Sequence, residues 1–155
     1  MTQEETGLTD AQESSTKFVP SFSSPATLAH EVGDLILEKK GTELTVINVE
    51  KVTSIADYLV ITTAQSSRQV TSMAKEIREF VKAGGGNFIS AEGADEGWWA
   101  LIDLGDVIVH IMQYDARRYY DLDMLWADGR VVRQAAMPEA GEEVGESEDD
   151  GQLAG

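Results

Sequence analysis

The stretch that decides the fold is WWALIDLGDVIV, which runs from Trp98 to Val109. It joins two strand-like apolar runs at Gly105-Asp106, where glycine supplies the positive φ that a two-residue hairpin turn needs. This turn sets the register, which pairs Leu104 with Val107, Ile102 with Val109 and Ala100 with Ile111. The resulting face is wholly aliphatic, so we predict that it lies in a core.

The other face of this hairpin is mixed in character. The same register pairs Asp103 with Ile108, Leu101 with His110 and Trp99 with Met112. Such a face is too apolar to be left in solvent and too polar for an ordinary core. We therefore expect something to cover it. Strand alternation sends Trp98 to the aliphatic face and Trp99 to the mixed face. We therefore predict that Trp98 belongs to the core and that Trp99 is the better surface candidate.

Charge and composition exclude several classes of partner. The net charge of -16 disfavours nucleic acid phosphate and anionic membranes, and fits a basic protein partner better. The chain has no cysteine, so it has no disulfide, thiolate metal site or thiol nucleophile. It also lacks an apolar run of about 18 residues. Residues 1–17 lack the basic and hydrophobic regions of a secretory signal. We expect a cytoplasmic protein that does not span a membrane.

The two ends of the chain differ from its middle. Residues 1–25 carry four acidic side chains and one basic side chain, and residues 134–155 carry seven acidic side chains and no basic one. Both ends have few large apolar residues, so we predict disordered acidic tails. The segment between them, 26–133, is close to the usual size of one domain.

Periodicity within 26–133 alternates between helix and strand. Helical spacing of Leu28, Val32, Leu35 and Ile36 predicts a helix that ends in a left-handed cap at Gly41. The runs 44–49 and 58–63 read as strands. A second helix follows, capped by Ser66 or Ser67, and ends at Gly84–Gly86; its predicted inward stripe is Val70, Met73, Ala74, Ile77 and Val81. A weaker strand at 87–91, the hairpin and helical turns within 115–126 complete an α/β sandwich.

Few side chains in this sequence are candidates for metal binding or catalysis. Asp57, Asp103 and Asp106 are conceivable metal ligands, but Asp106 suits a turn and Asp103 is placed to pair diagonally with His110. His110 has no nucleophile identifiable near it in the sequence, so we interpret it as a hydrogen-bonded packing residue. Gly84–Gly86 lacks a phosphate-binding signature. We predict no catalytic residue, no metal and no cofactor.

Four blocks of sequence together resemble the ribosomal silencing factor family, also called the Iojap family. They are DYLVI (57–61) followed by SRQV (67–70), WALIDLGDVIVHIM (99–112), ARRYYDL (116–122) and LW (125–126). The similarity spans about 26–130 and leaves both tails outside. It implies a mixed sheet of about five strands flanked by helices, similar to a nucleotidyltransferase fold. The combined signature of those enzymes, a Gly-Ser pair followed by Asp-x-Asp, is absent because this sequence has no Gly-Ser pair.

The resemblance also implies a function. Family members bind large-subunit ribosomal protein fourteen on the large ribosomal subunit, prevent joining of the small subunit and so repress translation, with little direct nucleic acid contact expected. Carried over by position, the expected contact residues are Trp99, Asp103, Leu104, Met112, Arg117 and Tyr120. Leu104 faces the aliphatic side, although its place beside the turn is expected to leave it exposed. Arg117 either pairs with a partner's carboxylate or balances local acids.

Two other classes of function remain open at this point. A nucleotidyltransferase-like enzyme rests on fold similarity alone. A homodimeric scaffold would cover the mixed hairpin face with a second copy of itself, and a homodimer of the free protein is compatible with the ribosome-binding interpretation.

Overall fold

The computed structural model describes residues 22–135 of the 155-residue chain. Its elements are α2 (Pro25–Glu38), β1 (Thr42–Asn48), β2 (Tyr58–Ala64), α3 (Ser67–Ala83), β3 (Ser90–Glu92), β4 (Trp99–Asp103), β5 (Val107–Gln113), α4 (Tyr114–Tyr120), α5 (Leu122–Leu125) and β6 (Arg130–Ala135). Apart from residues 22–25 and 134–135, the tails predicted to be disordered lie outside the described residues. The ordered elements begin at Pro25 and extend to Ala135, beyond both predicted edges of the domain.

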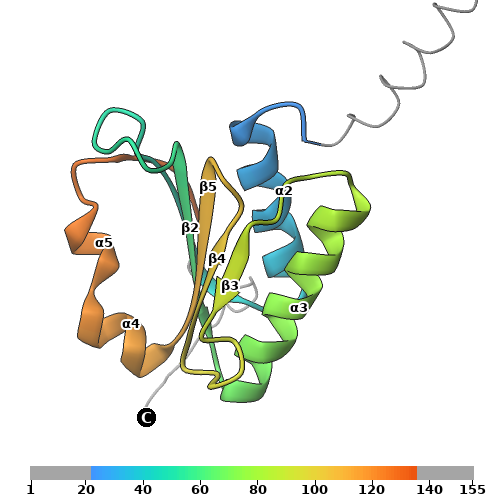
Figure 1. Cartoon of the computed structure of the whole chain (residues 1–155). Coiled ribbons are helices and arrows are strands. Elements are labelled where there is room, and N and C mark those ends of the chain that lie inside the picture. The colour runs from blue at the N-terminus through green and yellow to red at the C-terminus, as the bar shows by residue number, and fades with distance from the viewer. Residues whose placement is uncertain (1–21, 136–155) are drawn as a thin grey trace, which may run out of the picture.

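The strands form one six-stranded sheet in the order β3-β4-β5-β2-β1-β6. β2 and β5 run parallel, and every other neighbouring pair is antiparallel. α2 and α3 cover one face of the sheet, and α4 and α5 cover the other (Figure 1). The predicted mixed α/β fold is therefore confirmed. Its sixth strand, β6, was not predicted from the sequence.

The hairpin of β4 and β5 has the predicted register. Trp99 pairs with Met112, Leu101 with His110 and Asp103 with Ile108, and the intervening pairs also match the prediction. Gly105 takes a φ of +95°, and the Leu104 amide donates to the Val107 carbonyl at 2.9 Å. Glycine at the first turn position provides the backbone twist that a tight hairpin needs. A local turn thus sets which side chains face each layer.

The α2/α3 face of the sheet carries the larger core. All five residues of the predicted stripe on α3 are buried there, together with the aliphatic side of the hairpin. Ser66 caps α3, since its hydroxyl accepts a hydrogen bond from the Gln69 amide at 3.1 Å. An aliphatic strand face and an amphipathic helix stripe bury each other, and this removal of apolar surface from water is the main stabilising term.

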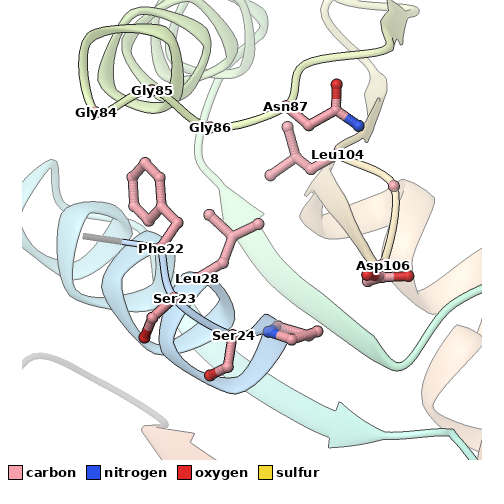
Figure 2. Close-up of a pocket in the computed structure, with 12 residues that line it drawn as sticks. Phe22, Ser23, Ser24, Leu28, Gly84, Gly85, Gly86, Asn87, Leu104 and Asp106 are labelled. Atoms are coloured by element: carbon pink, nitrogen blue, oxygen red, sulfur yellow. The ribbon is translucent and has the colours of Figure 1, made fainter. Parts of the chain in front are cut away.

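The glycines after α3 end the helix and also receive an aromatic ring. A Cβ atom at Gly84 would lie 2.5 Å from the Phe22 ring, and one at Gly86 would lie 2.8 Å from it. The Phe22 ring also meets the Phe80 ring edge-on, with centroids 5.6 Å apart. Figure 2 shows Phe22 beside this loop, at an open pocket of about 450 Å³ that reaches Leu104. The glycines therefore let residues before the predicted domain edge pack onto the core.

Two local predictions are wrong in position. Lys40, with a φ of +75°, takes the left-handed conformation after α2 in place of Gly41. Position 41 has no room for a side chain, because a Cβ there would lie 2.5 Å from Ile36 Cγ2 and 2.8 Å from Thr62 Oγ1. The weak strand predicted at 87–91 occurs as β3 at Ser90–Glu92, where it pairs with β4.

Candidate interaction surface

A second, smaller core lies under α4 and α5. Its buried members are Ile47, Val49, Leu59, Ile61, Met112, Ala116 and Leu122. Among these, Met112 has no exposed surface, and it packs beneath the helices. The prediction that something covers the mixed hairpin face is confirmed in part: Met112 and His110 are buried, and part of the cover comes from the same chain, whereas Trp99, Leu101, Asp103 and Ile108 stay half-buried. Met112 therefore supports this surface from below and does not itself reach its outside.

Trp99 is anchored on this face by a histidine. Its indole Nε1 donates to His110 Nδ1 at 3.0 Å. His110 is 7% exposed, and burial lowers its pKa from 6.5 to about 4. The imidazole is consequently neutral near pH 7, and in the tautomer protonated at Nε2 its Nδ1 accepts this bond. The predicted packing role of His110 is confirmed, but its partner is Trp99 and not Asp103. The carboxylate of Asp103 instead accepts from the Gly105 amide at 2.9 Å.

Four aromatic side chains form what we call the aromatic patch, in which Tyr120 contacts each of the other three: Trp98, Trp99, Tyr119 and Tyr120. The Tyr120 ring lies 4.6 Å from the Trp99 ring and 5.8 Å from the Trp98 ring, between centroids. Tyr119 meets Tyr120 edge-on at 4.9 Å. Trp98 is 42% exposed, Tyr120 44% and Tyr119 76%, whereas Trp99 is half-buried. Tyrosine and tryptophan exposed side by side are typical anchors of protein interfaces.

The prediction that Trp98 fills the core is wrong. β4 begins only at Trp99, so Trp98 lies before the strand, where side-chain alternation does not apply. Its side chain packs edge-on against Tyr120. The sequence carried one signal of this outcome: Gly97 directly precedes Trp98, and glycine commonly marks the boundary of a strand.

Leu104 also departs from its expected exposure. It is 2% exposed and belongs to the core of the α2/α3 face, as its register requires. Its backbone amide is bonded across the hairpin, which leaves the side chain no route to the α4/α5 side. Leu104 and the aromatic patch therefore lie on opposite sides of the sheet.

α5 also exposes apolar side chains to solvent. Met124 is 70% exposed and Leu125 is 68% exposed, while Trp126 is half-buried against the smaller core. α4 and α5 lie on the same side of the sheet (Figure 1). Sequence reasoning missed Met124 and Leu125, because a four-residue helix shows no periodicity from which to read an exposed face.

Arg117, which was expected to contact a partner, is instead enclosed. Its side chain is 11% exposed and forms an ion pair with Asp123 at 2.8 Å. It also donates to the Glu43 carbonyl at 2.5 Å and to the hydroxyls of Thr63 and Thr45, at 3.1 and 3.2 Å. The alternative in which Arg117 balances a local acid is the one that this geometry matches.

The three candidate metal-binding aspartates do not form a ligand cluster. Among residues 22–135, no group of three or more His, Cys, Asp or Glu side chains is placed to hold a metal ion. Asp57 and Asp106 meet through the backbone, where the Asp57 amide donates to the Asp106 carbonyl at 2.8 Å. Partial burial and the nearby Asp106 and Glu50 raise the pKa of Asp57. This contact links the hairpin turn to the start of β2.

No helix in the described part of the chain combines the length and apolar character that a bilayer-spanning helix requires.

Comparison with known proteins adds independent findings. The sequence model of the family described as "Ribosomal silencing factor during starvation" matches residues 22–153, and so reaches well beyond position 130. The ribosomal silencing factor of Bacillus subtilis is 37% identical over 91 residues, which is 59% of this chain and 77% of that protein. A Mus musculus protein named mitochondrial assembly of ribosomal large subunit protein 1 is 26% identical over 95 residues, 59% of this chain and 42% of that one.

A solved structure also matches. The crystal structure of a Chromobacterium violaceum protein superposes with a TM-score of 0.62 at 31% identity, covering 76% of this chain and 93% of the other.

Proposed function

This chain belongs to the ribosomal silencing factor family, and we propose that it binds the large ribosomal subunit through large-subunit ribosomal protein fourteen and blocks joining of the small subunit. Translation then falls because subunits that cannot join cannot initiate. The observation that carries the proposal is the aromatic patch, an exposed cluster of interface-type side chains on a chain that the comparisons assign to this family.

The proposed interface centres on Trp99 and Tyr120. Tyr120 is exposed, and Trp99 is held in one orientation by its bond to His110, so little side-chain entropy is lost on binding. Asp103 is half-buried at the hairpin end of the same strand as Trp99. In this proposal Met112 supports the surface from beneath, and Leu104 acts only through the hairpin.

Charge supports a protein contact in preference to an RNA contact. The chain carries 28 acidic and 12 basic side chains, which favours a basic ribosomal protein and disfavours nonspecific binding to ribosomal RNA. The proposed action needs no chemistry. An ordinary protein interface buries roughly 1,600 Å², and a factor seated at a site where the subunits meet excludes the other subunit by volume.

Sedimentation with separated ribosomal subunits tests this function. We expect the chain to pellet with large subunits and not with small ones, and to lower the yield of joined ribosomes when both are mixed. Trp99→Ala should weaken the binding. The matched control is Ile89→Ala, which removes an exposed apolar side chain, 54% accessible, outside the aromatic patch. Equal binding to both subunits, or to neither, contradicts the proposal.

A further inference from the structure

We propose that Arg117 is a positioning residue that holds α4 against the sheet so that Tyr120 stacks on Trp99; it presents the binding surface without touching the partner. This inference rests on the proposed function for its consequence in binding. Its structural part concerns the free protein alone and is tested separately.

α4 has little apolar surface with which to hold its place. It is seven residues long, and Ala116 is its only buried residue. Isolated helices of this length are unstable in water, because few hydrogen bonds compensate for the ordering of the backbone. α5 is shorter still and buries only Leu122. α4, which carries Tyr120, and α5 after it therefore need an anchor other than a hydrophobic stripe.

The guanidinium of Arg117 supplies that anchor. Its Nε and Nη2 atoms donate to the two carboxylate oxygens of Asp123, at 3.1 and 2.8 Å. Nη1 donates to the Glu43 carbonyl and to Thr63, and Nη2 also donates to Thr45. A guanidinium has five N–H donors, and these five bonds use all of them. One side chain on α4 thus ties together α5, β1 and β2.

The acceptor side of this site is built into β1. The pairing of β1 with β2 shifts between Thr42 and Thr45, and Glu43, inside the shift, has a φ of +49°. A non-glycine residue rarely adopts this conformation unless its surroundings hold it there. The Glu43 carboxylate accepts from Thr63 at 2.8 Å, and its carbonyl accepts from Arg117. The register shift in β1 therefore contains the carbonyl group that Arg117 binds.

α4 ends directly after Tyr120, at a left-handed residue. The Asp121 amide donates to the Arg117 carbonyl at 2.8 Å, and Asp121 takes a left-handed φ of +48°. Tyr120 occupies the last position of the helix, so its ring position depends on this end. With every donor used inside the molecule, Arg117 has none left for a partner's carboxylate or for an RNA phosphate.

The neighbouring Arg118 provides a matched control. It is on the same helix and is exposed, with its guanidinium 5.3 Å from the Tyr114 ring centroid and its Nη1 donating to the Tyr114 hydroxyl at 2.8 Å. These contacts stay within one turn of α4. Removal of this side chain should therefore leave the docking of α4 unchanged.

Hydrogen exchange on the free protein tests the anchor. Arg117→Ala should lose amide protection within 114–126 and keep the protection of α2 and α3, whereas Arg118→Ala should match the parent. Unchanged protection of 114–126 in Arg117→Ala overturns the inference, whatever is found for ribosome binding. Should Arg117→Ala fail to fold, Asp123→Asn weakens the same anchor more gently, and the same regional loss is expected.

A double-mutant cycle with purified large subunits then separates positioning from contact. Arg117→Ala should weaken binding by about tenfold, and much less than this when Tyr120→Ala is already present, since the ring that it positions is gone. If Arg117 touches the partner independently, the two losses multiply, and the positioning role is overturned. Failure of the parent chain to bind large subunits would contradict the proposed function, and the exchange result would still decide whether Arg117 anchors α4.

Discussion

The two faces of the sheet are built in different ways. The α2/α3 face is covered by helices of 14 and 17 residues that bury continuous aliphatic stripes. The α4/α5 face is covered by helices of seven and four residues, and its interior includes a neutral histidine and an enclosed arginine. Aliphatic burial stabilises without direction, whereas hydrogen bonds and aromatic contacts have defined geometry. We infer that the α2/α3 face mainly stabilises the fold and that the α4/α5 face fixes the positions of the side chains in the proposed binding surface.

The largest expected effect is on the α2/α3 face. Ile77→Ala removes a side chain with no exposed surface, and it should lower the free energy of unfolding by about 2 to 5 kcal/mol. Urea denaturation measures this loss, and Ile89→Ala should change stability by less than about 0.5 kcal/mol. Where Ile77→Ala is still folded, large-subunit affinity should equal that of the parent. A selective loss of affinity would show that the two faces do not divide these roles.

The next effect concerns pH and the α4/α5 face. The pKa of His110 is about 4 in the folded chain against 6.5 ordinarily, so between these values the unfolded state binds more protons. The contribution of neutral His110 to the free energy of unfolding is therefore fully present above pH 6.5. It decreases as the pH falls towards 4, by roughly 3 kcal/mol in total. Denaturation of the parent and of His110→Gln across this range isolates the contribution. Parallel curves for the two proteins would show that His110 is not held neutral.

Substitution of the neighbouring tryptophans sharpens the comparison within one face. Trp99→Ala should weaken large-subunit binding by about 2 kcal/mol, as expected for an interface anchor, with a moderate loss of stability. Trp98 is 42% exposed, so Trp98→Ala should cost less than about 1 kcal/mol of stability. Melting curves and binding titrations measure both quantities. A severe loss of stability in Trp98→Ala would mean that its side chain is buried after all.

The smallest effect is expected from the tails. A chain reduced to residues 22–135 should keep the parental free energy of unfolding within about 0.5 kcal/mol, because the removed segments have little apolar surface to bury. It should also keep its affinity for large subunits. Deletion of each tail separately serves as the control, since the family similarity reaches residue 153. A marked loss from the C-terminal deletion alone would place part of that segment in the domain or its interface.

Elements that depend on distant pairing were the ones mispredicted from the sequence. β6 escaped prediction because it is an edge strand whose Val131 and Val132 are exposed, and its partner β1 is distant in the sequence. A strand of this kind is defined by its pairing and not by a buried pattern. Trp98 was misplaced for a related reason, since alternation gives a face only inside a strand and the start of β4 depends on how β4 pairs.

The sequence by itself determined the hairpin register, the two long helices and the family, because a glycine turn, helical spacing and linear motifs are local properties of the chain. Only the tertiary structure decided which residues of the α4/α5 face are accessible to a partner. Met112 and Arg117 lie in the recognised motifs, yet short helices cover Met112 and acceptors from α5, β1 and β2 enclose Arg117. Exposure depends on what packs above a residue, and segments far apart in the sequence provide that packing.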